Sequence, residues 1–232
     1  MTKVRHSAGF EKDWVWRLGD VLVGGLCGAV FRVRFGGLEN LPAEGAVILA
    51  PNHVSVLDPV AIALGVSRRD RVVQFLAAAE AFEHPVWGRG LRLMKQIPIR
   101  RGTRDLAALD ELVDVLRDGR IAGIFPEGGI RDGRPPLKGH SGLVRIAVAT
   151  GVPVVPVGVW GTQERWPPGP PKLRPFRRTP LAISVGQPIR MTGPENGGPP
   201  LKEETRRIMA AIEVQLGAAK RLAAWAALRP GA

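Results

Sequence analysis

Short apolar runs alternate with amphipathic stretches along the chain. Runs rich in β-branched residues predict strands, and apolar residues repeated every three or four positions predict helices. This alternation predicts an α/β fold, with one domain built on a mixed, mostly parallel sheet flanked by helices. The predicted strands cover 31–35, 46–50, 71–78, 96–100, 121–125, 152–160 and 181–189, and the predicted helices cover 57–64, 81–94, 103–119, 142–150 and 201–228.

Local residues refine this pattern. Thr103 can cap the clearest helix and Gly119 can end it. Pro85 predicts a bend within the helix at 81–94. Pro153 and Pro156 place the strand at 152–160 at a sheet edge, or themselves at a strand end, because proline cannot donate to a strand ladder.

The first thirty residues have helical periodicity. Apolar residues recur between 14 and 30, and Asp13, Arg17 and Asp20 lie on another side. The apolar run 21–31 has eleven residues, fewer than the roughly 20 that span a bilayer. Because tryptophans beside basic residues suit the headgroup level, we expect an in-plane helix on a membrane. The alternative is an ordinary amphipathic helix that covers the core.

The charge and the cysteine content narrow the function classes. The net charge of +12, from 33 Lys+Arg against 21 Asp+Glu, favours anionic partners. Nucleic acid is disfavoured, since tyrosine is absent and no zinc-finger or RNP-like pattern occurs. The single cysteine, Cys27, excludes an intrachain disulfide. The scattered histidines have no metal-ligand spacing, so we expect no metal.

The stretch PNHVSVLDP at 51–59 follows a predicted strand. Ser55 and Asp58 have the spacing of a capping box, and Pro59 suits a first helical turn. This structural interpretation leaves His53 unexplained, at a strand's carboxyl end where α/β sheets place ligand sites. Either His53 is a passive loop residue, or it is a base that Asp58 orients.

Two further segments combine glycines and cations. In GIFPEGGIRDGR at 123–134, Glu127 ends a strand and the following glycines and Arg131 form a candidate phosphate cradle, or else a charged turn. In KQIPIRRGTRD at 95–105, Arg100 and Arg101 point to opposite faces, so one of them at most can face His53. By itself this second segment reads as a solvated basic turn.

The order of these motifs resembles the glycerolipid acyltransferase family, the 1-acylglycerol-3-phosphate acyltransferases and their relatives. NHVSVLD is similar to the family's Asn-His, four residues and Asp. QIPIRR, FPEGG and VPVVPV resemble its second, third and fourth blocks, and the blocks cover about residues 35–190 in the family's order. After Glu-Gly the family commonly has Thr and Arg, whereas this chain has Gly129 and Ile130.

The resemblance implies roles for these residues. His53 would be the general base and Asp58 would orient it. Arg101 would meet the phosphate of the acceptor, while Arg100 stands where the family often has Asp. The implied substrate-binding residues are Arg101, Glu127, Gly128, Gly129 and Arg131.

The implied reaction transfers a fatty acyl group from acyl-CoA or an acyl carrier protein to 1-acyl-sn-glycerol-3-phosphate, giving phosphatidic acid. It needs no cofactor beyond this co-substrate. The enzyme would have a glycerol-3-phosphate acyltransferase-like fold and lie, peripheral or monotopic, on the cytoplasmic face of the cell membrane. Glycerol 3-phosphate and a lyso-aminolipid stay open as other acceptors. A non-enzymatic basic module that binds lipid or nucleic acid is the alternative class.

Three parts make up the predicted domain organisation. Residues 1–34 form the membrane-associating segment, 35–200 the acyltransferase domain, and 201–232 a helical region packed on it. The Pro- and Arg-rich stretch 165–180 is a predicted surface loop and a candidate membrane contact.

Overall fold

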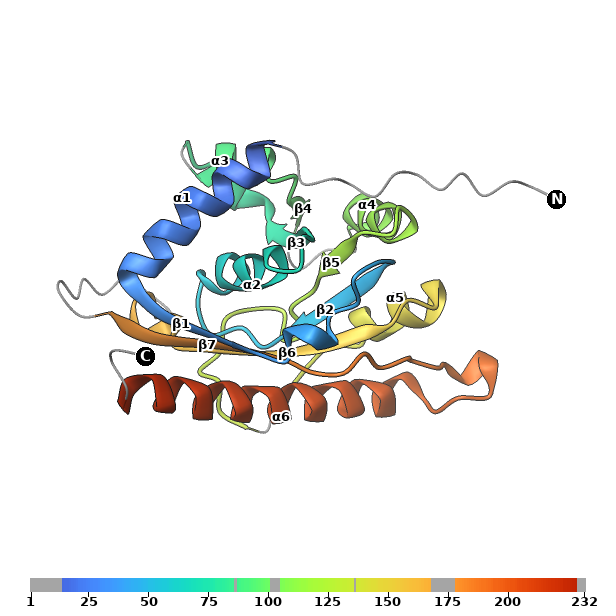
Figure 1. Cartoon of the computed structure of the whole chain (residues 1–232). Coiled ribbons are helices and arrows are strands. Elements are labelled where there is room, and N and C mark those ends of the chain that lie inside the picture. Colours follow the sequence, from blue (N-terminus) through green and yellow to red (C-terminus); the bar gives the residue numbers. More distant parts are fainter. Residues whose placement is uncertain (1–13, 86, 101–104, 136, 168–177, 229–232) are drawn as a thin grey trace.

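A seven-stranded sheet organises the computed structural model, which describes residues 14–85, 87–100, 105–135, 137–167 and 178–228 (Figure 1). The strand order is β1-β7-β6-β2-β5-β3-β4, and every neighbouring pair of these strands is parallel except β6 with β7. The strands are β1 (Phe31–Gly36), β2 (Val47–Pro51), β3 (Val73–Ala78), β4 (Ile97–Ile99), β5 (Ile121–Gly123), β6 (Val154–Trp160) and β7 (Thr179–Val185).

Helices cover both faces of the sheet. They are α1 (Trp14–Val30), α2 (Asp58–Ser67), α3 (Trp87–Leu93), α4 (Leu106–Arg117), α5 (Gly142–Thr150) and α6 (Leu201–Leu228). Ile48 and Ala50 pack in one buried cluster with α4, α5 and α6, whereas Val47 and Leu49 pack in another with α2. Successive residues of β2 therefore enter opposite layers, as expected for a strand buried on both faces. The predicted α/β fold with a mixed, mostly parallel sheet is confirmed.

The position of β6 corrects one prediction. This strand lies between β7 and β2, in the interior of the sheet, and not at an edge. Pro156 is accommodated there because the ladder with β7 begins at Val157. The Pro156 carbonyl accepts the Gly186 N–H at 2.9 Å, and the isolated bridge from Val154 to Ile189 follows, so no strand partner needs an N–H from Pro156. The missing N–H of Pro156 thus falls in a gap of the antiparallel pairing.

Two helix predictions are also corrected. Asp105 caps α4 by accepting a hydrogen bond from the Ala108 N–H at 3.3 Å, so the helix begins after the predicted residue, and Thr103 lies outside the described residues. The stretch 81–94 is not one bent helix, because a short 3-10 turn, η2 (Ala79–Phe82), precedes a separate α3. Its hydrophobic pattern alone could not separate these two pieces.

Helix α1 packs on α2 through small and polar residues. A Cβ atom at Gly24 would lie 3.7 Å from Leu64, and the Ser67 hydroxyl donates to the Asp20 carboxylate. The apolar stripe of α1 faces away from the sheet. Its most exposed members are Leu18, Val21, Leu22 and Leu26, with exposed fractions between 50% and 72%. None of the helices in the described part of the chain is both long and apolar enough to cross a bilayer.

Candidate active site

The loop from β2 to α2 carries the candidate catalytic residues at the carboxyl end of a parallel strand. Asn52 fixes the start of this loop to β6, because its side-chain amide donates to the Val159 carbonyl at 3.1 Å and accepts from the Val159 N–H at 2.8 Å. Asn52 is fully buried. These two bonds resemble the hydrogen bonds between paired strands, and they fix the position of the backbone just before His53.

Asp58 is the centre of the hydrogen-bond network. Its Oδ2 atom lies 2.9 Å from His53 Nδ1 and accepts the backbone N–H groups of Val54 and Ser55 at 2.7 and 2.8 Å. Its Oδ1 atom accepts the Thr162 hydroxyl at 2.5 Å. The carboxylate is fully buried, and these donors compensate for the water that burial removes.

The capping prediction is partly wrong. Helix α2 begins at Asp58, with Leu57 as its N-cap residue and no side-chain cap bond. Ser55 instead accepts the Leu57 N–H at 3.2 Å and donates to the Trp166 carbonyl at 2.7 Å. Asp58 does reach back to the Ser55 N–H, as in half of a capping box. Pro59 lies in the first turn, as predicted.

The imidazole of His53 is held on one side and open on the other. The ring stacks on Phe125, with centroids 4.0 Å apart, and its side chain is 11% exposed. Nδ1 points to Asp58, whereas Nε2 makes no hydrogen bond to any described residue. An Nδ1–H that donates to the carboxylate leaves the Nε2 lone pair able to take a proton. We call His53 and Asp58 the dyad.

The segment after β5 brackets the backbone of His53. The Glu127 carboxylate accepts the His53 N–H at 2.8 Å, and the Arg131 N–H donates to the His53 carbonyl at 2.7 Å. Glu127 is buried, and this burial raises the pKa of its carboxyl group above its ordinary value. The Glu127 side chain thus holds the backbone of His53 in place.

The other predicted binding residues make fewer contacts with the dyad. Gly128 has a φ of 68°, and a Cβ atom there would meet the His140 ring at 3.1 Å. Gly129 has open space around it, and the Arg131 side chain is exposed. Arg101 lies outside the described residues. Thr162 was missed by the sequence analysis, because it lies 104 residues from Asp58 and no local pattern links them.

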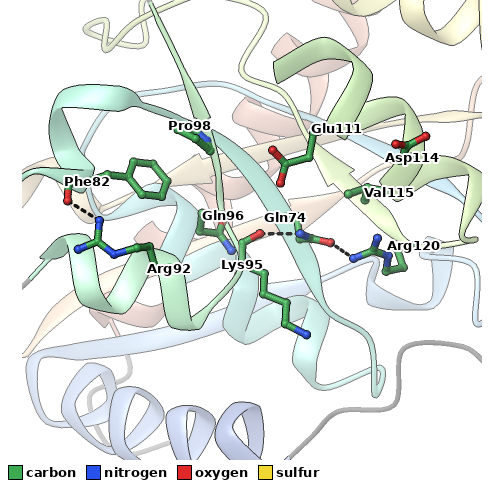
Figure 2. A pocket seen from close by; sticks show the side chains of 10 residues that line it. All are labelled: Gln74, Phe82, Arg92, Lys95, Gln96, Pro98, Glu111, Asp114, Val115 and Arg120. Atoms are coloured by element: carbon green, nitrogen blue, oxygen red, sulfur yellow. Dashed lines mark hydrogen bonds between the residues drawn. The ribbon is translucent and has the colours of Figure 1, made fainter. Parts of the chain in front are cut away.

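Two cavities lie elsewhere, and neither is lined by the dyad. One, of about 390 Å³, runs between α1, α2 and β1 and is here named the α1 groove. The other, of about 580 Å³, is here named the outer groove (Figure 2). The α1 groove is lined by Asp20, Gly24, Cys27, Gly28, Phe31, Val33, Phe35, Leu64, Ser67, Arg68 and Arg178. The outer groove is lined by Gln74, Phe82, Arg92, Lys95, Gln96, Pro98, Glu111, Asp114, Val115 and Arg120.

Comparison with known proteins identifies the family. A family model described as Acyltransferase matches residues 32–160, which include the dyad and the segment after β5. The chain belongs to the Acyltransferase family. The resemblance inferred from the motifs is thereby confirmed.

Individual relatives and a solved structure agree with this family. An uncharacterized protein of Mycobacterium tuberculosis is 32% identical over 149 residues, which are 59% of this chain and 39% of the relative. The 1-acyl-sn-glycerol-3-phosphate acyltransferase of Bacillus subtilis is 28% identical over 65% of this chain and 70% of its own length. The crystal structure of the Thermotoga maritima 1-acyl-sn-glycerophosphate acyltransferase matches with a TM-score of 0.64 and 27% identity, over 89% of this chain and 78% of that one.

Proposed function

We propose that this acyltransferase moves a fatty acyl group from a thioester to the free hydroxyl of 1-acyl-sn-glycerol-3-phosphate. The observation that carries the proposal is the dyad geometry, in which Nδ1 is bound to a buried carboxylate and Nε2 has no hydrogen-bond partner among the described residues. The name of the Bacillus relative supports this acceptor, as do the name and the similar fold of the Thermotoga protein. Acyl-CoA and an acyl carrier protein both supply a suitable thioester, and no further cofactor is needed.

His53 is the general base in this mechanism. Nε2 takes the proton of the acceptor hydroxyl while the oxygen attacks the thioester carbonyl, and the imidazolium is stabilised by Asp58. The C–S bond of the tetrahedral intermediate then breaks, and the leaving thiolate takes the proton back from Nε2. The products are an ester and a thiol. Such proton transfer typically contributes about 10²–10⁴-fold to the rate.

The cations around the segment after β5 are proposed to bind the acceptor phosphate. Arg131 is exposed, and its backbone N–H is hydrogen-bonded to the His53 carbonyl. Its side chain is therefore attached to the backbone close to the base. Arg101, the last residue of the second block, is proposed as a second cation on the evidence of the motif alone. Glu127, Gly128 and Gly129 shape the loop that presents Arg131.

The α1 groove is proposed to hold the acyl chain. It begins at the same end of the sheet as the dyad, because Phe31 and Arg178 lie at the start of β1 and just before β7, which both run opposite to β2. From there it extends along β1 to Phe35 and the last turn of α2. Apolar walls come from α1, β1 and α2, and its volume lies within the roughly 300–1,000 Å³ of ligand pockets. Charged residues are found among its lining only at Asp20, Arg68 and Arg178.

Filling this groove tests the assignment. Cys27→Phe adds volume inside the groove, whereas Ala29→Phe adds the same side chain on an exposed position of α1. We expect the Cys27 variant to lose activity toward long acyl chains by about tenfold relative to short ones, the scale of an overpacking cost. Thiol release from acyl-CoAs of graded length measures this. Equal chain preference in both variants would contradict the assignment.

The exposed stripe of α1 is proposed to lie in a membrane surface. Its apolar residues, together with the net charge of +12, match the amphipathic and electrostatic parts of interfacial binding. We therefore propose a peripheral location on the cytoplasmic face of the cell membrane. Leu22→Glu should weaken sedimentation with anionic vesicles, whereas Gly25→Ala, also on the exposed side, should not. Unchanged binding of the Leu22 variant would exclude this stripe as the membrane contact.

An acceptor panel tests the function itself. Purified protein is given one acyl thioester with 1-acyl-sn-glycerol-3-phosphate, glycerol 3-phosphate or a lyso-aminolipid, and thiol release is followed. We expect the first acceptor to give the highest kcat/KM, with acyl-CoA and acyl carrier protein compared as donors. Preference for another acceptor would reassign the substrate. Absence of thiol release, with salt-dependent binding to vesicles or DNA that is indifferent to His53→Ala, would favour a binding module.

A further inference from the structure

We propose that Thr162 is a positioning residue, whose hydroxyl fixes the plane of the Asp58 carboxylate and thereby the orientation of His53. The inference rests on the proposed role of His53 as the base. Thr162 opens η3 (Thr162–Glu164), the turn that follows β6, and its hydroxyl donates to Asp58 Oδ1 at 2.5 Å. Both residues are fully buried. A carboxylate can only accept, so the direction of this hydrogen bond is settled.

The two oxygens of Asp58 are held from different parts of the chain. The donors to Oδ2 are His53 Nδ1 and the N–H groups of Val54 and Ser55, all within five residues of Asp58. They fix one oxygen, and the carboxylate can still turn about that point. Thr162 reaches Oδ1 from the turn after β6 and supplies the second fixed point. Hydrogen bonds to an ionised acceptor are about twice as strong as neutral ones, so the bond suits this role.

The turn that carries Thr162 is itself placed by close packing. Gly161 has a φ of 112°, and a Cβ atom there would lie 2.1 Å from the Pro180 carbonyl oxygen. Only glycine fits this crossing against β7. Further along, the Trp166 carbonyl accepts the Ser55 hydroxyl at 2.7 Å. The loop of the dyad is therefore hydrogen-bonded on both sides of Thr162. Before Thr162, Val159 is bonded to Asn52, and after it the Trp166 carbonyl is bonded to Ser55.

The hydroxyl also disperses the negative charge of the carboxylate. Without it, the full charge of Asp58 is directed at the imidazole and favours the protonated ring more strongly. The base is then neutral only at higher pH. Loss of the hydroxyl should therefore lower kcat and move the acid side of the pH–rate profile to higher pH. A purely structural role would lower the amount of folded enzyme and leave the profile in place.

Three substitutions separate the hydroxyl from the methyl group. Thr162→Val keeps the volume and loses the hydroxyl, Thr162→Ser keeps the hydroxyl, and Thr162→Ala loses both. We expect kcat to fall about 10–100-fold in the Val and Ala variants, the kinetic equivalent of one hydrogen bond to a charged group, with KM unchanged. The Ser variant should keep kcat within about threefold, although its buried cavity lowers the melting temperature.

The outcome is read from kcat, KM and the pH–rate profile of each folded variant, with His53→Ala beside them. Wild-type kcat and profile in Thr162→Val, or a Ser variant as slow as Ala, would overturn the inference. If Thr162→Val does not fold, the Ala and Ser pair decides in the same way. Activity that survives His53→Ala would instead refute the proposed base, so the two failures are distinguishable.

Discussion

Polar side chains play different parts in the dyad and in the outer groove: in the outer groove they hold the backbone, whereas in the dyad they hold a ring that keeps one nitrogen available. In the outer groove, Gln74 donates to the Lys95 carbonyl at 2.5 Å and accepts from Arg120 at 2.5 Å, and Arg92 donates to the Phe82 carbonyl at 2.7 Å (Figure 2). These groups brace the backbone around the amino ends of β3 and β5.

At the dyad, both carboxylate oxygens of Asp58 accept hydrogen bonds. Within the part of the chain that the structure describes, Nε2 of His53 makes none. Part of the outer groove lies at the end of the sheet opposite to the dyad, since Gln74, Gln96 and Arg120 begin or precede parallel strands. His53 instead follows the end of β2. The larger cavity is therefore a poorer guide to chemistry than a rigidly held side chain with one unused atom.

Substitution of one residue from each region gives the largest contrast. His53→Ala should lower acyl transfer about 10²–10⁴-fold, because the proposed mechanism assigns the removal of the hydroxyl proton to His53. Arg92→Ala, in the outer groove, should stay within about threefold of wild type, as expected for a surface change away from the chemistry. Thiol release measures both, and circular dichroism checks that both variants fold. A comparable loss of acyl transfer in the two variants would contradict the functional difference between the dyad and the outer groove.

Replacing one buried hydrogen-bonding side chain in each region tests the comparison of the dyad with the outer groove more finely. Asp58→Asn should lower kcat about 10²-fold or more, because an amide cannot accept at both of its atoms and no longer stabilises the imidazolium. Gln74→Leu leaves the Lys95 carbonyl and Arg120 without this partner, so about 1–3 kcal/mol of stability should be lost with kcat intact. Kinetics and thermal melting are compared for both. The account is contradicted if Gln74→Leu is the slower enzyme.

The smallest effect concerns the pH dependence of stability. Burial raises the pKa of Glu127 above its ordinary value of 4.5. The stability that goes with the protonated carboxyl is fully present below that ordinary value and is lost as pH rises through the raised pKa. Glu127→Gln, which can still accept the His53 N–H, should remove this loss.

The matched control for this change is Glu111→Gln, an exposed carboxylate of the outer groove. Melting temperatures between pH ~4 and ~8 should show wild type falling relative to Glu127→Gln as pH rises, and Glu111→Gln controls for the removal of one carboxylate. Parallel curves for Glu127→Gln and wild type would show that burial of Glu127 carries no such cost.

The sequence predicted those features that local pattern determines. Hydrophobic periodicity located the strands and most helices, because burial on one or both faces repeats along each element. The spacing of His53 and Asp58 made their pairing one of two alternatives, and the resemblance to the acyltransferase motif favoured it; the structure places the two side chains 2.9 Å apart. The interior place of β6 could not be predicted, since it depends on where the ladder with β7 begins relative to Pro156.

The remaining parts of the site depend on contacts between distant segments. Thr162 reaches Asp58 and Trp166 reaches Ser55 only after β6 lies beside β2. The capping prediction failed in part because α2 begins only at Asp58, with Leu57 as its N-cap residue, so the Ser55 hydroxyl accepts the Leu57 N–H outside the helix. The predicted division into segments 1–34, 35–200 and 201–232 stays a prediction.

The protonation pattern of the His53 ring is the most direct test of the central claim. Nitrogen-15 NMR of histidine-labelled protein, assigned by comparison with His53→Ala, reports which ring nitrogen carries hydrogen. We predict a neutral ring that carries its hydrogen on Nδ1, with Nε2 unprotonated. A neutral ring that carries its hydrogen on Nε2 would contradict the proposal that this nitrogen is the base.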